Sequence, residues 1–356
     1  MKIRLDKLLY RFLAGSLSFI LINGIALARP IDVTASTQEL REEVTTLKNN
    51  TVGAQLLDGG FFQPSLVVKW TGPTFSAEYD AMQAVAMHHV IWQWTVDSKN
   101  KQAYYPTTLP GVSRISSKDL VEISLNEAKK KGLKVWLGLN WNDDWFKNYA
   151  NNEKWLTNEV SLSKNVVQEL WRQYGNTYAN TIAGFYLPME VDNVNFQGVE
   201  KQKRIARAYK EITEEIHNTT AKLVMIAPFF NQNTGQGVFK YADMWGDILK
   251  VAPIDVIALQ DGIGCGHASV STIGKWLDAL GTKIREVRPE TQLWSDLETF
   301  TPGLKPAPIE RVISQISAEH QYVSKFTSFS FNHYDSPNNG HAKQFRQYKE
   351  YVDSQR

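Results

Sequence analysis

Short apolar runs alternate with amphipathic segments along most of this chain. The runs have the length and composition of strands, and the amphipathic segments have the three-to-four-residue apolar spacing of helices. The predicted strands cover residues 54–62, 90–96, 133–141, 182–191, 223–230, 254–260, 291–298 and 326–334. The predicted helices cover residues 77–87, 117–131, 158–181, 199–217, 238–250, 271–287, 309–320 and 341–353. Gly132 follows the second helix, where a glycine stop is common.

Strands that alternate with helices predict βαβ units and a parallel sheet. Eight such units in about 300 residues fit a closed (β/α)8 TIM barrel better than an open doubly wound sheet. No Gly-x-Gly-x-x-Gly turn follows the first strand, where Gly59-Gly60-Phe61-Phe62 lacks the spacing of a dinucleotide site. We therefore predict an α/β fold, with one barrel domain over residues 53–356.

The first 28 residues have the pattern of a secretory signal peptide. Four basic residues up to Arg11 precede an apolar stretch, residues 12–28, that ends in Ala26-Leu27-Ala28. The apolar run is short for a membrane span, so an uncleaved anchor is the alternative. Residues 29–52 form a polar linker with a short leader helix near 37–48. We expect a periplasmic or secreted protein without stable membrane insertion after cleavage.

The positive charge of the chain resides in this signal. Without residues 1–28, 35 basic and 36 acidic side chains remain, a net charge of −1. The mature chain therefore lacks the basic face of a nucleic-acid binder, and no nucleic-acid partner is expected. The sequence contains no His-Glu-x-x-His helix, Gly-x-Ser-x-Gly elbow or Walker loop, so we expect no metal and no cofactor.

The lone Cys265 cannot form an internal disulfide. In one interpretation it is a nucleophile with His267 as its base. A structural or loop thiol is the favoured interpretation. Gly262, Gly264 and Gly266 around it predict a flexible loop rather than a phosphate cradle.

Two glutamates close predicted strands, Glu190 at the fourth and Glu298 at the seventh. Catalytic groups of such barrels lie where the strands end, and two convergent carboxylates suit glycosidic bond cleavage. Pro188 lacks an N–H group, so regular pairing should end just before Glu190. The alternative for Glu190 is a structural role, as a solvated loop residue or a helix cap.

Trp294, Asp296 and Glu298 share one side of the seventh strand, and we expect that side to face the barrel interior. The alternative role for its two acids is a buried ion-pair network. Asp296 is predicted to support catalysis, as an orienting acceptor or as the ionised partner. Asp261, after the sixth strand, is the third acidic candidate.

Aromatic and amide side chains gather at the predicted strand ends, as in a sugar-binding mouth. The chain has 11 Trp, 14 Tyr and 16 Phe, although such rings are also ordinary core material. Trp92 and Trp94 are expected on one side of the second strand. The predicted substrate-binding residues are Trp94, Asn140, Trp141, Trp145, Tyr186, Asn231, Gln260, Trp294, Asn332 and Tyr334. Carbohydrate is the predicted partner.

The segments Tyr186-Leu187-Pro188-Met189-Glu190 and Trp294-Ser295-Asp296-Leu297-Glu298 resemble clan A retaining glycoside hydrolases. They look most like a bacterial family of glycosidase-like barrels known as domain of unknown function 4434. The resemblance covers about residues 55–353. It implies that Glu190 is the acid/base and Glu298 the nucleophile. The clan usually has Asn before the acid/base, where this chain has Met189, so the hydrogen bond of that Asn to the sugar 2-hydroxyl must come from elsewhere or be absent.

The leading hypothesis is a glycoside hydrolase that acts on a polysaccharide or oligosaccharide by a retaining two-glutamate mechanism. Transglycosylation uses the same intermediate and stays open. The non-enzymatic alternative is a carbohydrate-binding barrel that assists exopolysaccharide export or modification, and a link to exopolysaccharide machinery is a further possibility.

Overall fold

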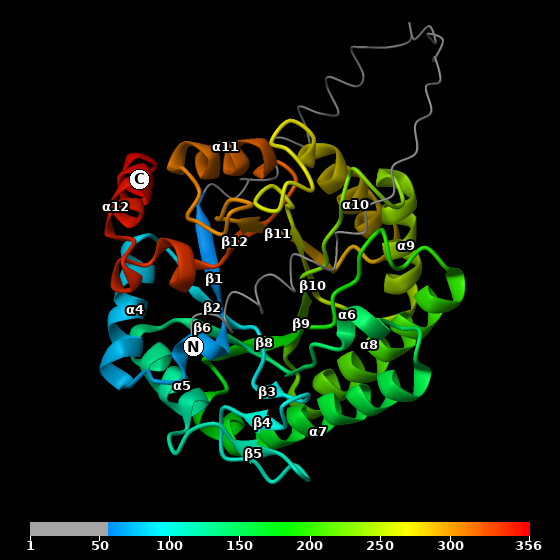
Figure 1. Cartoon of the computed structure of the whole chain (residues 1–356), viewed down its shortest axis with the longest axis horizontal. Helices are drawn as coiled ribbons and strands as arrows, with labels where there is room; N and C mark the ends of the chain where they lie inside the picture. The colour runs from blue at the N-terminus through cyan, green and yellow to red at the C-terminus, as the bar shows by residue number, and fades with distance from the viewer. Residues whose placement is uncertain (1–55) are drawn as a thin grey trace, which may run out of the picture. The chain divides into compact units, whose positions relative to one another are not determined.

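Each of the eight predicted strand and helix pairs has a counterpart in the computed structural model, which describes residues 56–356. The strands close into one parallel barrel in the order β1-β12-β11-β10-β9-β8-β6-β2 (Figure 1). They are β1 (Leu57–Phe62), β2 (His89–Trp92), β6 (Lys134–Gly138), β8 (Ile182–Leu187), β9 (Leu223–Ile226), β10 (Val256–Gln260), β11 (Gln292–Glu298) and β12 (Lys325–Phe329). The predicted TIM barrel is therefore confirmed. The predicted signal peptide (1–28) and the leader helix within 29–52 lie outside the described residues.

The helices form a ring outside the strands in Figure 1. They are α4 (Gly72–Ala84), α5 (Leu120–Lys131), α7 (Glu153–Tyr178), α8 (Val199–Thr220), α9 (Val238–Val251), α10 (Ile273–Val287), α11 (Ile309–Glu319) and α12 (Ala342–Ser354), with the short α3 (Pro64–Val67) and α6 (Trp145–Asn148). The α4 helix begins before its predicted start, since a proline occupies its first turn. The Asp119 side chain caps α5 by accepting the Glu122 N–H at 2.9 Å. Gly132 ends α5 with φ of 70°, as predicted.

Large side chains fill the barrel interior, as in a packed core rather than a pore. The interior cluster comprises Phe61, Ile91, Trp136, Tyr186, Met225, Ala227, Val256, Ala258 and Trp294. Trp136 needs a glycine opposite it, because a Cβ at Gly184 would come within 2.4 Å of its ring. The core thus fixes how closely β6 and β8 approach.

Pairing between the first and last strands closes the barrel. Gly59 pairs with Thr327 and Gly60 with Ser328. The first N–H group of β1, that of Leu57, donates to the Tyr348 hydroxyl of α12 at 2.8 Å. The C-terminal helix therefore satisfies a backbone group at the beginning of the barrel.

The segment between β2 and α5 forms a small sheet with β7, which follows β6, and the sequence did not predict this sheet. Its strands are β3 (Val96–Asp97), β4 (Gln102–Ala103), β5 (Ser113–Arg114) and β7 (Asn140–Trp141), in the order β5-β4-β3-β7. Two-residue strands are too short to show an apolar period. Glu169 of α7 holds this segment, because it accepts hydrogen bonds from Tyr105 Oη, Thr107 Oγ1 and Thr108 Oγ1 at 2.9, 2.6 and 2.7 Å.

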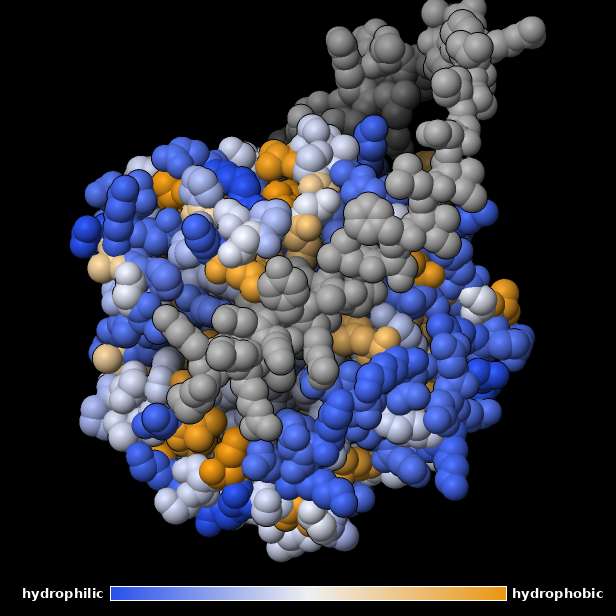
Figure 2. Space-filling view, viewed as in Figure 1, coloured by the Kyte–Doolittle hydropathy of each residue, from blue (hydrophilic) through white to orange (hydrophobic). Residues whose placement is uncertain are grey.

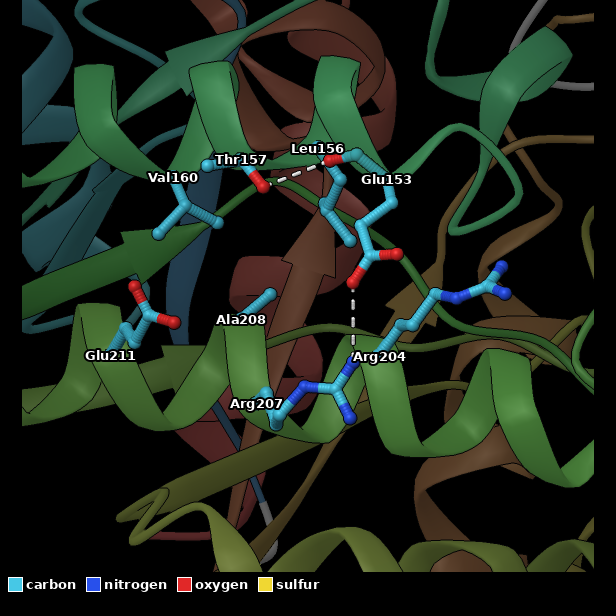
Figure 3. A pocket seen from close by; sticks show the side chains of 8 residues that line it. All are labelled: Glu153, Leu156, Thr157, Val160, Arg204, Arg207, Ala208 and Glu211. Carbon is cyan, nitrogen blue, oxygen red and sulfur yellow. Dashed lines mark hydrogen bonds and ion pairs between the residues drawn. The ribbon is translucent and has the colours of Figure 1, made fainter.

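The outer helical layer is polar over α7 and α8 (Figure 2). A pocket of about 80 Å³ lies between these two helices and is lined by Glu153, Leu156, Thr157, Val160, Arg204, Arg207, Ala208 and Glu211 (Figure 3). It is small beside the roughly 300–1,000 Å³ of ordinary ligand sites. Within residues 56–356, no helix combines the length and apolarity that a membrane span requires.

Glu169→Ala should lower the free energy of unfolding by about 2–4 kcal/mol, because it leaves the buried Tyr105 hydroxyl and two threonine hydroxyl groups without their acceptor. Urea unfolding of the purified protein measures this change. Glu200→Ala on the exposed face of α8 is the matched control, and it should stay within about 0.5 kcal/mol of the parent. Equal stability of the two variants would contradict the role assigned to Glu169.

Candidate active site

Glu190 lies in a rigid segment directly after β8. The strand ends at Leu187, so Pro188 stands where pairing stops, as predicted. Three elements then hold the backbone. The Tyr209 hydroxyl of α8 donates to Met189 O, the Trp145 indole N–H of α6 donates to Glu190 O at 2.9 Å, and the Phe229 N–H donates to Val191 O at 3.2 Å. Glu190 is therefore positioned by packing and is no solvated loop residue.

Glu298 is the last residue of β11, on the same side of the strand as Asp296 and Trp294. Ser295, between them, donates to Glu319 of α11 and so faces the helices. The predicted orientation of this strand is correct. The Glu298 main chain is held from outside the barrel, since its N–H donates to Asp261 Oδ1 at 3.3 Å and its carbonyl accepts from Arg311 Nη2 at 2.7 Å.

The Glu298 carboxyl group is held by the loop that follows β10. Cys265 N–H donates to Oε2 at 2.6 Å, and the Cys265 thiol donates to Oε1 at 3.2 Å. The sequence favoured a structural thiol at this position, and the structure adds that it contacts a candidate catalytic group. The rival interpretation as a nucleophile lacks its base, since no hydrogen bond joins Cys265 to His267 among the described residues.

The two glutamates interact electrostatically, but their surroundings differ. Burial raises the pKa of Glu190 well above its usual range; a hydrogen bond from Gln260 opposes this, while Asp192 and Glu298 add to it. Burial and Asp261 raise the pKa of Glu298 to about 8, against the Cys265 donors and the positive charge of Arg311. The Glu298 carboxyl group thus has two donors from Cys265 and a nearby guanidinium that favour its ionised form, whereas Glu190 has a single amide donor. Surroundings that differ in this way are typical of an acid and a nucleophile that share one site.

Asp296 lies inside the barrel near both glutamates. Burial raises its pKa well above the usual range, Thr327 Oγ1 donates to it at 3.1 Å, and the charges of Asp261, Glu298 and Glu190 raise its pKa further. The alternative of a buried ion-pair network does not describe these surroundings, which are three carboxyl groups and a hydroxyl.

Asp261 is buried close to Glu298 and Asp296, and its charge raises the pKa of both. Its carboxyl group accepts from Ile263 N–H at 3.0 Å, from the Gln315 amide of α11 and from Glu298 N–H. It therefore secures the loop and β11, and its supporting role in catalysis stays a prediction.

Two predicted binding residues adjoin the glutamates. Gln260 pairs in register with Asp296, donates to Ala227 O at 2.8 Å and hydrogen-bonds Glu190. Tyr186 lies one layer deeper, edge-on to Phe61 at 5.2 Å between ring centroids, and the charges of Glu190 and Asp296 contribute to raising its pKa. Both side chains therefore lie beside the acids.

Asn332 and Tyr334 follow β12 on the π-helical turn η1 (Phe331–Asp335). Both are 1% exposed. The two side-chain polar atoms of Asn332 and the Tyr334 hydroxyl have no hydrogen-bond partner. Buried polar groups are normally satisfied, so these atoms are suited to meet the hydroxyl groups of a ligand.

Trp94 and Trp141 stack on each other after β2 and β6, with ring centroids 6.1 Å apart at 29°. Trp92 does not join them, because β2 ends there and the strand parity used in the prediction no longer applies. Trp92 instead packs on Phe75 of α4 and donates to Ser124 of α5 at 3.0 Å.

Trp294 lies at the opposite end of the barrel from the candidate site. It precedes Glu298 by four residues, or about 13 Å of strand, and contacts His89 and Trp136 at 5.6 and 5.7 Å between centroids. His89 begins β2 and has its pKa lowered to about 4 by burial, so its neutral ring accepts the Trp136 N–H at 3.1 Å. Side-chain parity predicted the direction of Trp294 but not its depth.

Three other predicted binding residues support the fold. Asn140 points at α7, donating to Glu159 at 2.8 Å and accepting from Ser163 at 2.6 Å. Trp145 packs beneath Glu190, with its indole on the backbone. The Asn231 side-chain oxygen closes a turn by accepting Asn233 N–H at 2.9 Å. The contacts of all three are within the protein.

Sequence reasoning missed three residues that shape the site. Asn193 joins two loops through four hydrogen bonds, two of them to Asn231 at 3.0 and 2.8 Å. Arg311 and Gln315 of α11 hold Glu298 and Asp261. All three contacts link segments distant in sequence, so no local pattern signals them. Within residues 56–356, no group of three or more His, Cys, Asp or Glu side chains could hold a metal ion.

Comparisons with known proteins agree with this fold. The sequence model of a family described as Domain of unknown function (DUF4434) matches residues 57–341. No protein of curated function matches the chain.

Solved structures resemble the fold at low sequence identity. A proposed α-L-fucosidase from Bacteroides thetaiotaomicron aligns with a TM-score of 0.70 and 17% identity, covering 85% of this chain and 96% of that one. An endo-1,4-β-mannanase from Rhizomucor miehei gives 0.59 and 13%, covering 85% and 99%. One from Thermotoga petrophila gives 0.57 and 12%, covering 84% and 99%. These likenesses show the TIM-barrel fold.

Glu298→Gln should stabilise the protein increasingly as the pH rises. The folded-state pKa of Glu298, about 8, lies above its ordinary value of 4.5. Folding therefore takes up a proton between these values, and the parent loses stability as the pH rises through that window. The glutamine variant lacks this loss. Relative to the parent, its free energy of unfolding should increase by about 2–4 kcal/mol from pH 5 to pH 8.

Urea unfolding at both pH values measures this difference. The exposed Glu310→Gln, also on the β11 side, is the matched control and should show a constant difference. A Glu298→Gln curve parallel to that of the parent would rule out the raised pKa.

Proposed function

We propose that this chain, which belongs to the family described as Domain of unknown function (DUF4434), is a glycoside hydrolase that cleaves a polysaccharide or oligosaccharide. The observation that carries the proposal is the pair Glu190 and Glu298, electrostatically coupled but unequally hydrogen-bonded. The structural relatives support a glycoside substrate, since they are described as a fucosidase and mannanases. They differ from one another in the sugar.

In the proposed reaction Glu298 is the nucleophile. Its ionised oxygen attacks the anomeric carbon as the bond to the leaving oxygen breaks, and Glu190 donates its proton to that oxygen. Glu190, now ionised, then removes a proton from water. The water oxygen attacks the anomeric carbon and releases Glu298. Two inversions give overall retention of configuration.

The assignment of roles follows from the surroundings of each carboxyl group. Two donors from Cys265 and the charge of Arg311 oppose the rise in the pKa of Glu298 caused by burial and Asp261, so Glu298 reaches the ionised form that a nucleophile requires near and above pH 8. Glu190 has the Gln260 amide but also the charge of Asp192 nearby, which favours the protonated form that an acid requires.

The proposed substrate contacts are the stacked Trp94 and Trp141, for the apolar face of a sugar, and Asn332 and Tyr334, for its hydroxyl groups. Met189 cannot donate the hydrogen bond that the clan draws from Asn, so Asn332 is the proposed substitute. We further propose that the signal at residues 1–28 directs the chain to the periplasm or out of the cell.

Replacing either glutamate should impair catalysis on a panel of aryl glycosides and bacterial exopolysaccharides. Loss of Glu190 as general acid should lower kcat on the order of 10²–10⁴-fold. Glu190→Gln should lose least on substrates with dinitrophenolate leaving groups, which need no proton, and azide should restore its second step. Glu298→Gln should lose activity on every substrate. Glu310→Gln is the control, and parental turnover by Glu298→Gln would remove Glu298 from the mechanism.

The product should keep the anomeric configuration of the substrate. Proton NMR, recorded before mutarotation, distinguishes the two anomers directly. An inverted product would instead indicate carboxyl groups far enough apart to admit water between them, roughly 6.5–9.5 Å. Saccharide binding without any product would favour the carbohydrate-binding alternative.

A further inference from the structure

One residue, Cys265, donates to both oxygens of the Glu298 carboxyl group. Its N–H reaches Oε2 at 2.6 Å and its thiol reaches Oε1 at 3.2 Å. The loop that carries it turns at Gly262 and Gly266, with φ of 69° and 76°. Side chains with a Cβ rarely adopt this left-handed conformation. The glycines therefore allow the chain after β10 to fold back over the end of β11.

Gly264 brings this loop into contact with Glu298. A Cβ at that position would lie 2.7 Å from Glu298 Cβ, 2.7 Å from Phe300 O and 3.0 Å from Glu298 Oε2. No side chain fits there without displacement. The close approach of the Gly264 main chain puts the following N–H group on the carboxylate.

The Cys265 side chain is a donor rather than a nucleophile. Burial and the neighbouring Glu298 raise the pKa of this thiol well above its ordinary value. A protonated thiol keeps the S–H group that Glu298 Oε1 accepts.

Tyr334 points to a ligand at the same place. Its hydroxyl is buried without a partner, and Cys265 and Glu298 both lie near enough to contribute to raising its pKa, so the three groups are neighbours. Tyr334 is held by stacking on Phe300 at 5.3 Å between centroids. A hydroxyl held in this way and left unsatisfied is suited to a group of the substrate beside Glu298.

We propose that Cys265 is the positioning residue of Glu298: its N–H and thiol hold both carboxylate oxygens, fix the carboxylate orientation and favour its ionised form. The role of Glu298 as nucleophile rests on the proposed function, whereas the hydrogen bonds between Cys265 and Glu298 do not depend on it. Alkylation of this thiol would remove the S–H donor and insert atoms beside Glu298, so it should inactivate the enzyme.

The chain contains a single cysteine, so a thiol reagent reports on Cys265 alone. Alkylation by iodoacetamide, followed from pH 6 to 10, gives the midpoint of thiol ionisation, which does not depend on how easily the reagent enters. Glu298→Gln should lower this midpoint by at least one pH unit and speed alkylation at pH 8 about tenfold. Glu310→Gln should keep the parental midpoint. Equal midpoints for the parent and Glu298→Gln would overturn the proposal.

Kinetics on a cleaved aryl glycoside test positioning directly. Cys265→Ser keeps an N–H and a hydroxyl donor, so its kcat/KM profile against pH should follow the parent. Cys265→Ala loses the side-chain donor, so its acidic limb should move to higher pH and kcat should fall while KM changes little. A parental profile for Cys265→Ala would refute positioning by the thiol. A shifted thiol midpoint together with no glycoside cleavage would uphold the contact and defeat the proposed function instead.

Discussion

Closure of the barrel is the constraint on which the rest of this structure depends. The ends of β8 and β11 face a common mouth because β1 pairs with β12 and completes the ring. The first strand needs small residues to fit among its neighbours, since a Cβ at Gly59 would lie 2.9 Å from the His89 carbonyl of β2 and one at Gly60 2.9 Å from Phe331 Cβ of the turn after β12. An open sheet with the same strands would separate Glu190 from Glu298. Their electrostatic coupling is thus a product of topology rather than of local sequence.

The sequence predicted most of the fold, because alternation of apolar runs and helical spacing is a local signal that extended over eight repeats. It also placed Glu190 and Glu298 at strand ends. The depth of a side chain in the barrel and the direction in which it points were harder to predict. Strand parity placed Trp294 on the same side as Glu298 but did not show that a layer of the barrel separates them. Asn140 points outward and donates to Glu159, a helix residue 19 positions later. The role of Cys265 depends on a contact across 33 positions, which no spacing rule reveals.

The surroundings of the two glutamates show how one barrel makes similar side chains unequal. Burial raises the pKa of both carboxyl groups, and different neighbouring groups lower it in each case. At Glu298 the pKa is lowered by donors from a glycine-rich loop and by the charge of Arg311. Arg311 also donates to the main-chain carbonyl groups of Glu298 and Phe300. Asp261 raises the pKa of Glu298 by its charge while accepting its N–H. The position of Glu298 and the pKa of its carboxyl group are therefore controlled by the same residues, so a substitution that moves Glu298 also changes its pKa.

The hydrogen bond from Leu57 N–H to Tyr348 also sets an order of events during synthesis. The first strand finds one neighbour in β2 soon after it leaves the ribosome, but its other partners, β12 and α12, are made last. Contacts of such long sequence separation form slowly and late. The barrel must therefore stay open, with an unpaired edge on β1, until β12 and α12 are available.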